Sequence, residues 1–592
     1  MILSLLTLAL LSQTPADAPD VPNAGFPGNP TGTRPQVEIA WNRLYDDAEI
    51  YAHLDRLAER WPDLLTHEVI GHSVEGREMR VYTLNDPASG PVDSKPAMWV
   101  DANVHGNEVQ GGETTVYLLW YLLENKGTNE RVDELLARAS FHVLPMVNPD
   151  GRHHWFADAN SPHSSRTGHQ PTDSDRDGKY DEDPPNDLDG DGHIVQMRKH
   201  VPGEGTHNLD PEDPRILIPV PKNDTGEKGD WIMLGTEGYD DDGDGRVNED
   251  GGGGYDMNRA WPSSWRPGHV QYGAGPYPLY WPETRCIAQF LYAHSNVAAV
   301  QSFHNTGGMI LRGPGAEIFG EYPRSDLRVY DELGADGERM LPFYRYMILW
   351  KDLYSVFGGF VTWAYEGLGI ISFTNELWVS NRMYPQDAKD PNAGWFGGGS
   401  RKDRMWFNDQ LLSGAGFVEW HEVEHPLYGT IEVGGFRKDF GRVPPSFLIE
   451  EELHRNAIFC IRHAEAMPEV VVRSTEVSSL GEGLTAVDVI FANLRAIPTR
   501  TARAAQKQIG AQDRFTIEGD GIEVLTGGFR TDRWHPERMQ FETLEPQRLQ
   551  RESGIPGRGE VRVRWIVRGS GTATVRWTGE KARDVEIHVE LP

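Results

Sequence analysis

The sequence predicts two architectures in one chain: a mixed α/β domain whose mostly buried sheet is flanked by helices, and an all-β sandwich behind it. Between residues 37 and 466, short apolar runs alternate with segments whose apolar residues recur at helical spacing, which is typical of a sheet covered by helices. From residue 467 to 592 the runs are short, alternating or β-branched, and turns separate them, which favours antiparallel strands. A chain of 592 residues is also too long for one ordinary core.

Each expected element rests on its apolar spacing and on the residues that end it. Residues 46–61, for example, carry Ile50, Leu54 and Leu57 at helical spacing and stop at Pro62. The helices expected in the α/β domain are residues 46–61, 113–123, 131–138, 282–292 and 447–466, and its strands are residues 65–70, 79–84, 97–104, 141–147, 298–303, 309–311 and 369–373. The strands expected in the sandwich are residues 470–472, 486–492, 521–525, 560–567, 572–577 and 584–591.

The N-terminal residues have the pattern of an export signal. An apolar run is followed by the small residues Ala16 and Ala18, which predicts a signal peptide over residues 1–18, and the Pro- and Gly-rich residues 19–36 are expected to be an extended lead-in. The run is too short to span a bilayer, and no later stretch is long and apolar enough. We therefore expect a secreted or periplasmic protein without a membrane span. The net charge of −32 argues against nucleic acid as a partner, because that needs clustered Lys and Arg.

Residues 152–254 differ from the rest of the α/β domain and are expected to form an acidic insertion at the functional edge of its sheet. Three of its loops alternate aspartates before glycines, as calcium-binding loops do. Their aspartates are Asp173, Asp175 and Asp177; Asp187, Asp189 and Asp191; Asp240, Asp242 and Asp244. The twelfth loop position holds Pro184, Arg198 or Gly251 in place of the bidentate Glu, so these are not EF-hands. They are calcium loops closed by other ligands, or solvated acidic loops.

Residues with metal and acid–base chemistry follow several of the expected strands. His105 and Glu108 come after the strand at 97–104, His304 ends another, and Glu376 follows a third. Such strand ends are where α/β enzymes mount metals, although one His-x-x-Glu pair is expected by chance in a chain of this composition. Asn258 and Arg259 set an amide beside a guanidinium, a pair suited to a planar carboxylate.

A second metal motif competes with this set. His421, Glu422 and His425 spell His-Glu-x-x-His, which binds zinc when both histidines share a helix face. Pro426 follows directly and disfavours helical geometry at His425. We expect this motif to be a surface segment or the rim of a cleft, and not the zinc site.

Taken together, six motifs resemble, in their order, those of zinc metallocarboxypeptidases of the carboxypeptidase A/B class. They are His105-x-x-Glu108, Asn148-Pro149-Asp150-Gly151, Asp256-x-Asn258-Arg259, Pro282-Glu283-Thr284-Arg285, Ser302-Phe303-His304 and Ser372-Phe373-Thr374-x-Glu376. The resemblance covers roughly residues 40–465 and implies a zinc carboxypeptidase-like fold there. It also implies one catalytic Zn²⁺ held by His105, Glu108 and His304, with Glu376 as the general base.

The resemblance further implies which residues bind substrate. Asn258 and Arg259 would hold the terminal carboxylate, and Tyr354 falls where the family has a mobile tyrosine that covers bound substrate. The family's oxyanion arginine matches Arg166, with Arg198 as the alternative. Two departures stand out: the acidic insertion is absent from digestive members, and Asn375 replaces an apolar residue, which is expected to alter the surroundings of the base.

The expected function is hydrolysis of C-terminal peptide bonds by zinc-activated water, with peptide or protein C-termini as substrates. The first alternative is an amidase of the same fold that acts on cell-wall or γ-glutamyl peptides. The second is a catalytically silent, calcium-stabilised binding protein. Cys286 and Cys460 are either buried free thiols or one disulfide. Oligomeric state, terminal side-chain preference and the role of the sandwich stay open.

Overall fold

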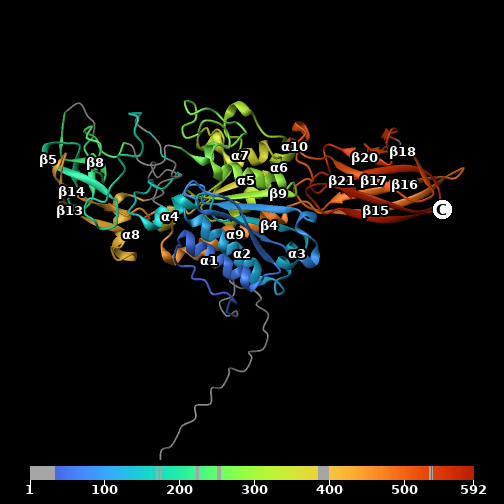
Figure 1. Cartoon of the computed structure of the whole chain (residues 1–592), viewed down its shortest axis with the longest axis horizontal. Coiled ribbons are helices and arrows are strands. Elements are labelled where there is room, and N and C mark those ends of the chain that lie inside the picture. The colour runs from blue at the N-terminus through green and yellow to red at the C-terminus, as the bar shows by residue number, and fades with distance from the viewer. Residues whose placement is uncertain are drawn as a thin grey trace, which may run out of the picture.

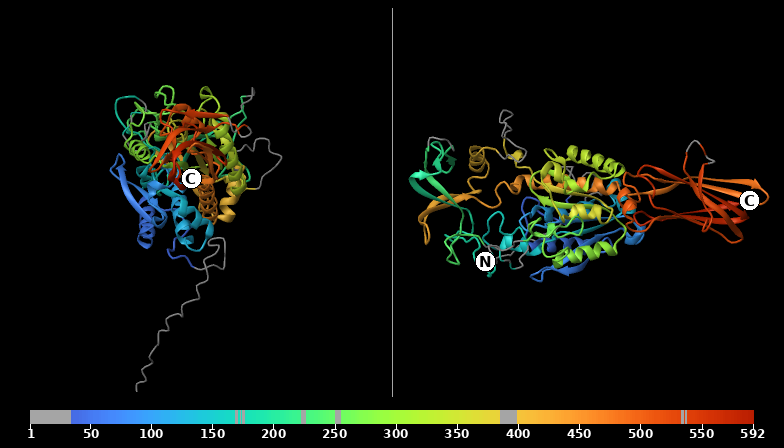
Figure 2. Two further views of the ribbon diagram at one scale, coloured as in Figure 1. Left: turned by 90° about the vertical axis from the view of Figure 1, so that its right-hand side faces the viewer. Right: turned by 90° about the horizontal axis from the view of Figure 1, so that it is seen from above.

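The computed structural model describes residues 34–592 apart from 168–170, 172, 174–175, 222–225, 250–254, 385–398, 533–534 and 536–537. The expected signal peptide and all but the last three residues of the expected lead-in lie outside the described residues. Three parts form a row, as Figure 1 and the view from above in Figure 2 show: a lobe around β5 and β14, a central α/β domain, and the C-terminal strands.

The central domain is built on an eight-stranded mixed sheet, which confirms the predicted fold class. The strand order is β1-β2-β4-β3-β9-β12-β10-β11, and β4, β3, β9 and β12 are parallel neighbours. The strands are β1 (Leu65–His72), β2 (Glu78–Leu84), β3 (Ala97–Ala102), β4 (Ser140–Leu144), β9 (Val297–Asn305), β10 (Met309–Arg312), β11 (Arg345–Ile348) and β12 (Ile371–Leu377). Every residue of β3, β4 and β9 is buried, as expected for strands covered on both faces.

Helices cover both faces of this sheet because its side chains alternate between two cores. Met98 and Val100 join one core, and Trp99 between them joins the other. The first core contains residues of α1 (Asp47–Arg60), α2 (Gln110–Asn125), α3 (Glu130–Arg138), α6 (Arg324–Met340) and α9 (Ile449–Glu465), and the second contains residues of α5 (Pro282–Ala293) and α7 (Phe360–Glu366). The helices and strands expected in this domain are present within a few residues, whereas α6 and α7 were not expected.

The acidic insertion contains strands that the sequence did not reveal. Four of its strands join two from residues 417–436 in a six-stranded sheet ordered β13-β14-β5-β8-β6-β7. They are β5 (Gln196–Gly205), β6 (His207–Leu209), β7 (Leu217–Pro219), β8 (Gly229–Thr236), β13 (Phe417–His425) and β14 (Gly429–Phe436), and α8 (Arg401–Leu411) lies beside them. The buried core between them is small and centres on Val195, Met197, Ile431 and Val433. The residue expected to begin the insertion, Arg152, lies inside α4 (Pro149–Ala157).

The second predicted architecture, an all-β sandwich, is confirmed by two antiparallel sheets that follow α9. One is ordered β15-β16-β21-β18-β19 and the other β20-β17-β22-β23. The strands are β15 (Val470–Gly481), β16 (Leu484–Asn493), β17 (Asp513–Glu518), β18 (Ile522–Arg530), β19 (Met539–Glu542), β20 (Arg548–Arg551), β21 (Glu560–Gly569), β22 (Gly571–Thr578) and β23 (Val585–Leu591). The sheets share one core, in which the rings of Phe491 and Phe515 from opposite sheets lie 5.2 Å apart.

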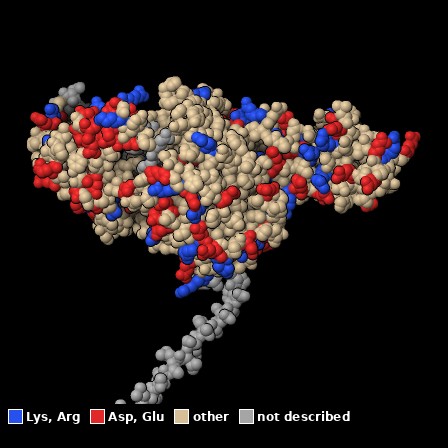
Figure 3. Space-filling view, in the orientation of Figure 1, with Lys and Arg blue, Asp and Glu red and all other residues tan. Residues whose placement is uncertain are grey.

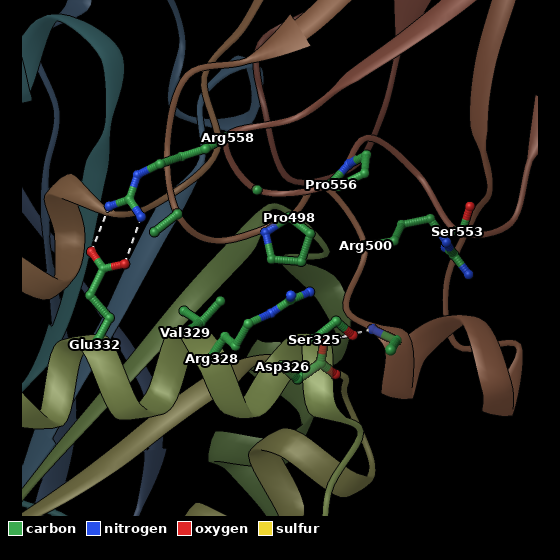
Figure 4. Close-up of a pocket in the computed structure, with 13 residues that line it drawn as sticks. Ser325, Asp326, Arg328, Val329, Glu332, Pro498, Arg500, Ser553, Pro556 and Arg558 are labelled. Atoms are coloured by element: carbon green, nitrogen blue, oxygen red, sulfur yellow. Dashed lines mark hydrogen bonds and ion pairs between the residues drawn. The ribbon is translucent and has the colours of Figure 1, made fainter. Parts of the chain in front are cut away.

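The sandwich contacts the central domain along α6 through one buried carboxylate and one exposed ion pair. Asp326 accepts hydrogen bonds from the amides of Ala502 and Arg503 at 2.9 and 3.1 Å, at the start of the short helix α10 (Ala502–Lys507). Arg558 forms a two-pronged ion pair with Glu332, drawn with dashed lines in Figure 4. These contacts border a cavity of about 490 Å³ at the junction.

Within the described part of the chain, none of the helices has the length and apolarity to cross a membrane. Cys286 and Cys460 are both free and buried, Cys286 in the core beneath α5 and Cys460 in the core beneath α9. The disulfide alternative is therefore wrong for this fold.

Candidate metal centre and active site

The expected zinc ligands meet at the carboxyl ends of two parallel strands. β3 and β9 are neighbours, so the loop after β3 brings His105 and Glu108 to His304 near the end of β9. The Nδ1 atoms of His105 and His304 lie 2.9 Å from the two carboxylate oxygens of Glu108. One ligand atom from each side chain lies within 4.8 Å of the other two, and all three side chains are buried. We call these residues the zinc cluster.

The zinc cluster fits a zinc ion. Zn²⁺ binds His nitrogen and carboxylate oxygen at about 2.0–2.2 Å, so ligand atoms of one tetrahedral ion lie roughly 3–4 Å apart. In the cluster both Nδ1 atoms lie 2.9 Å from Glu108, and the three ligand atoms lie within 4.8 Å of one another, which one ion can bridge with small adjustments. Burial acts to raise the pKa of Glu108, but the imidazoles of His105 and His304 hold that pKa well below its ordinary value. Glu108 is therefore in the anionic form that a metal needs.

Asp256 fixes the orientation of His105. Its carboxylate oxygens lie 3.1 and 3.3 Å from His105 Nε2, so a proton on Nε2 leaves the lone pair of Nδ1 directed to the zinc cluster. Burial acts to raise the pKa of Asp256, but the charges of His105 and Arg259 keep it well below its ordinary value. Asp256 was not assigned a role from the sequence. Its place in the Asp256-x-Asn258-Arg259 motif was the signal that could have identified it.

Glu376 lies beside the zinc cluster. β12 runs parallel to β9, and Glu376 is the partner of His304 in the strand register. Burial, and after it the negative charge of Glu108, raise the pKa of Glu376 to about 7, while His304 and two arginines act to lower it. A carboxyl group whose pKa lies near neutrality can both take up and release a proton.

Asn375 does not face the base. Consecutive strand residues point to opposite sides of a sheet, so Asn375 lies on the side away from Glu376. Its Oδ1 accepts from Gln301 Nε2 at 2.8 Å, and its Nδ2 donates to Asn456 Oδ1 at 2.9 Å. The expectation that Asn375 alters the surroundings of Glu376 is not met. Asn375 instead forms hydrogen bonds with the buried side-chain amides of Gln301 and Asn456 beneath α9.

Arg166 lies directly on the zinc cluster. Its Nη1 donates to Glu108 Oε1 at 2.8 Å, and its Nη2 lies 3.1 Å from His105 Nε2 and 3.7 Å from Asp256 Oδ2. The backbone carbonyl of Arg166 accepts the amide of Gly106 at 2.9 Å, which holds its loop next to His105. The guanidinium group thus lies against two of the expected zinc ligands and Asp256.

Arg198, the alternative oxyanion arginine, lies in the lobe. It is part of β5, and its Nε donates to Glu432 Oε2 at 2.7 Å. Its guanidinium group stacks over the rings of Trp231 and Trp420, 4.7 and 4.1 Å from their centroids. The structure therefore brings Arg166 to the zinc cluster and occupies Arg198 elsewhere.

Asn258 and Arg259 follow Asp256 in the short helix η3 (Met257–Arg259). Asn258 Oδ1 accepts the amide of Phe360 at 2.8 Å, at the start of α7, which leaves its Nδ2 as the donor for a ligand. Arg259 Nη1 donates to the carbonyl of Asn258 at 2.8 Å and lies 3.9 Å from Asp256 Oδ2. Asp256 therefore links this amide–guanidinium pair to His105.

Tyr354 follows the π-helical turn η5 (Leu349–Leu353), and 53% of it is exposed. Within the described residues, no hydrogen bond or ring contact joins its side chain to the zinc cluster. Its chain continues to Gly358, whose carbonyl accepts the amide of Trp261 at 3.0 Å. The segment that carries Tyr354 thus packs beside Arg259 while the ring itself lies in solvent.

Arg442 is a further basic group at the site that was not identified from the sequence. Its Nε donates to the carbonyl of Asn107 at 3.0 Å, and its Nη2 lies 3.8 Å from Glu108 Oε1. Nη2 is buried and meets no hydrogen-bond acceptor in the described part of the chain. Arg442 follows β14, far along the chain from the other site residues, and no local pattern marks it.

The competing His-Glu-x-x-His motif lies in β13 and not in a helix. In a strand, residues four apart are separated by about 13 Å, against about 6 Å in a helix, so His421 and His425 cannot share one metal ion. His425 Nε2 instead lies 2.9 Å from the carbonyl of Gly238, and His421 Nε2 lies 2.7 Å from Asp189 Oδ2. The expectation of a surface segment is confirmed for His421, which is exposed.

The acidic loops of the insertion lie side by side in the lobe, where acidic side chains gather in Figure 3. Asn186 Nδ2, just before the second loop, donates to Asp241 Oδ2 in the third at 3.0 Å. Among the described residues, the metal-sized acidic groups are Asp177, Glu182 and Asp242; Asp187, Asp189 and Glu237; and Asp240, Asp242 and Asp244. Asp175 lies outside the described residues, and Asp173 and Asp191 accept backbone amides but join none of these groups.

Residues 50–191 and 234–392 match the zinc carboxypeptidase family. The chain belongs to this family. The match spans all the expected zinc ligands and Glu376, whereas Arg442 lies beyond it. Residues 469–590, which form the sandwich, match a domain of unknown function.

Curated relatives share only a part of their length with this chain. Carboxypeptidase D of Mus musculus is 35% identical over 132 residues, which is 22% of this chain and 9% of that protein. Carboxypeptidase B of Astacus astacus is 35% identical over 118 residues, which is 20% of this chain and 37% of that protein.

Among solved structures, the chain is similar to thrombin activatable fibrinolysis inhibitor, with a TM-score of 0.41 and 16% identity over 72% of this chain and 74% of that one. It is also similar to the carboxypeptidase A of Helicoverpa armigera, with a TM-score of 0.39 and 18% identity over 64% of this chain and 76% of that one.

Proposed function

We propose that the protein is a zinc-dependent metallocarboxypeptidase that hydrolyses C-terminal peptide bonds of peptides or proteins. The observation that carries this proposal is the zinc cluster of His105, Glu108 and His304, with Glu376 as the register partner of His304. Membership of the zinc carboxypeptidase family supports it.

In this proposal each residue has a defined task. When bound, Zn²⁺ polarises the scissile carbonyl and lowers the pKa of a water molecule. Glu376 removes a proton from the attacking water and delivers it to the leaving amine. Arg166, whose guanidinium group already contacts Glu108, stabilises negative charge on the carbonyl oxygen. Asp256 keeps His105 in the tautomer that can bind metal.

The exopeptidase character rests on the amide–guanidinium pair. Asn258 Nδ2 and the free donors of Arg259 would bind the terminal carboxylate of the substrate, in the two-pronged manner that suits a guanidinium group. Tyr354, which is exposed on a neighbouring segment, would cover the bound residue.

The two alternatives are less well supported. An amidase that acts on cell-wall or γ-glutamyl peptides would share the zinc cluster, but the curated relatives are named carboxypeptidases. A catalytically silent binding protein would have no need of an intact ligand set and a base beside it.

One experiment distinguishes the proposed carboxypeptidase from the two alternatives. Zinc content and hydrolysis of blocked dipeptides with free or amidated C-termini would be measured for wild type, His105→Ala, Glu376→Gln and His421→Ala. We expect His105→Ala to lose zinc and Glu376→Gln to keep zinc but lose about 10²–10⁴-fold in kcat. His421→Ala should resemble wild type, and amidated peptides should be poor substrates. Zinc retained in His105→Ala but lost in His421→Ala would contradict the assignment.

We also propose that residues 1–18 direct export and are removed. This rests on the apolar run and the small residues that follow it. N-terminal sequencing of protein from the culture medium or periplasm should begin near residue 19, and protein that keeps Met1 in the cytoplasm would contradict this.

A further inference from the structure

The third acidic loop, residues 240–249, folds around its own carboxylates. Asp240 accepts the amides of Gly243 and Gly245 at 2.7 and 3.1 Å, and Asp242 accepts the amide of Asp244 at 2.9 Å. One carboxylate oxygen from each of the three aspartates lies within 4.8 Å of the other two. These bonds shape the loop but do not by themselves identify a ligand.

A carboxylate from another segment supplies the independent observation. Asp183 is 1% exposed, and its Oδ1 accepts the amide of Asp241 at 3.0 Å. Its Oδ2 is fully buried and receives no hydrogen bond from any described residue. Leaving a buried carboxylate oxygen without a donor or a cation is costly, so Asp183 points to a missing positive partner.

Glu249 adds a second such group at the same place. Both of its carboxylate oxygens are buried and without a donor in the described part of the chain. Burial raises the pKa of Glu249 to about 7, and close contact with the carboxyl groups of Asp183 and Asp244 acts in the same direction. Glu249 therefore lies close to both Asp183 and Asp244, and the amide that Asp183 accepts places it against the same loop.

No basic side chain among the described residues neutralises this group. Arg246 lies 3.8 Å from Asp244 Oδ2, and Lys179 pairs with Asp177 and Glu182. Neither forms an ion pair with Asp183 or Glu249. The available ligand atoms are all oxygens, which hard cations prefer. The carboxyl groups are several and come from separate positions, which suits the large and irregular coordination of Ca²⁺ better than the octahedral geometry that Mg²⁺ needs.

We propose that Asp183, Asp240, Asp242, Asp244 and Glu249 form a calcium-binding site. Asp183 and Glu249 take the closing role of the Glu that is absent from the twelfth loop position. Asp183 precedes β5 and the other ligands follow β8, so the ion joins the two ends of the segment that forms most of the lobe's sheet. Because the lobe's apolar core is small, we expect the ion to contribute much of the lobe's stability.

The argument for a missing cation does not apply to the second acidic loop. Glu237 lies near Asp187 and Asp189, but both of its carboxylate oxygens already accept amides, from Val195 at 2.6 Å and Leu188 at 3.2 Å. The proposed site is therefore limited to the third loop and Asp183.

The test measures calcium binding on the full chain, apart from peptidase activity. Protein freed of calcium on a chelating resin, with its zinc content confirmed, would be titrated with CaCl₂ by calorimetry, and its Tm followed with CaCl₂ or MgCl₂. We expect saturable calcium binding and a Tm that rises with Ca²⁺ far more than with Mg²⁺. Absence of calcium binding, or an equal rise with Mg²⁺, would overturn the proposal.

Near-isosteric variants locate the site. Asp183→Asn and Glu249→Gln should each weaken calcium binding by about tenfold or more, because calcium affinity follows the number of charged ligands. The control is Glu204→Gln, which removes one charge from an exposed position of the same lobe. Retained zinc would show that each variant is folded. Wild-type calcium affinity in folded Asp183→Asn and Glu249→Gln would overturn the assignment.

Discussion

At the residue scale, the charges of acidic groups and arginines offset each other around the zinc cluster. Glu108, Asp256 and Glu376 bring negative charge into a buried site, and Arg166 and Arg442 offset it. Arg166 was predicted from the sequence, whereas Arg442 was not. The buried Nη2 of Arg442 has no acceptor among the described residues, and we propose that it donates to bound substrate.

Replacing Arg442 by Gln tests that role. We expect zinc content to stay and kcat/KM to fall by about 10- to 100-fold, since a hydrogen bond from a charged donor contributes about 1.5–3 kcal/mol. Arg442 acts to lower the pKa of Glu376, so its loss raises that pKa and leaves the base protonated up to a higher pH. The acidic limb of the pH profile should therefore move to higher pH.

The control is Arg442→Lys, which keeps the charge and should leave the acidic limb near its wild-type position. Unchanged kcat/KM together with an unchanged pH profile in Arg442→Gln would show that Arg442 only packs against Asn107.

The residues of the zinc cluster and Glu376 were joined into one site by the resemblance to zinc carboxypeptidases. The structure gives the physical reason, because these residues follow apolar runs and the carboxyl ends of neighbouring parallel strands meet. Arg442 could not be found in this way. It reaches the site from a loop after β14, and its position depends on the packing of Lys438 and Val443 against Trp155 of α4.

At the element scale, the lobe shows where periodicity fails as a guide. β5 and β8 pair along much of their length, yet most of their residues are partly exposed, so they lack the apolar alternation that marks a half-buried strand. β14, the partner of β5, lies far along the chain, beyond the reach of any local pattern. The His-Glu-x-x-His motif lies in β13, which is a strand because it forms a hairpin with β14.

The loop after β3 depends on close backbone packing, which a single methyl group can probe. A Cβ added at Gly106 would lie 2.2 Å from the carbonyl oxygen of Ser165 and 2.4 Å from the Cα of Gly151. Gly106→Ala must therefore push the chain that carries Arg166 away from the zinc cluster. We expect a loss of about 1–3 kcal/mol in the free energy of unfolding, measured by denaturant titration, and a lower kcat/KM.

The matched control is Gly268→Ala. Gly268 is exposed, and an added Cβ there meets nothing within 4 Å. Gly268→Ala should leave both quantities unchanged. A fully active and stable Gly106→Ala would mean that the three backbone segments are not in contact in solution.

At the scale of the whole molecule, the sandwich contacts the end of the sheet away from the zinc cluster. Lys581 Nζ donates to the carbonyl of Val297 at 2.6 Å, at the amino end of β9, whereas His304 lies near the carboxyl end of the same strand. The lobe lies at the other end of the molecule (Figure 2). Arg166 of the insertion and Arg442 after β14 both reach Glu108, whereas the sandwich contacts the opposite end of β9. We therefore expect the sandwich to affect stability more than catalysis.

Replacing Asp326 tests whether the sandwich contributes to stability and not to catalysis. It is fully buried and accepts hydrogen bonds from the amides of Ala502 and Arg503 and from the hydroxyl of Tyr365. Asp326→Ala leaves those donors buried without a partner, which costs about 1–3 kcal/mol in the free energy of unfolding. We expect denaturant titration to show this loss while kcat and KM stay at wild-type values, because Asp326 lies on α6 at the junction and not beside the zinc cluster. Arg328→Ala, an exposed change on the same helix that borders the same cavity in Figure 4, should alter neither. A fall in kcat/KM without a loss of stability in Asp326→Ala would instead mean that the junction communicates with the zinc cluster along β9.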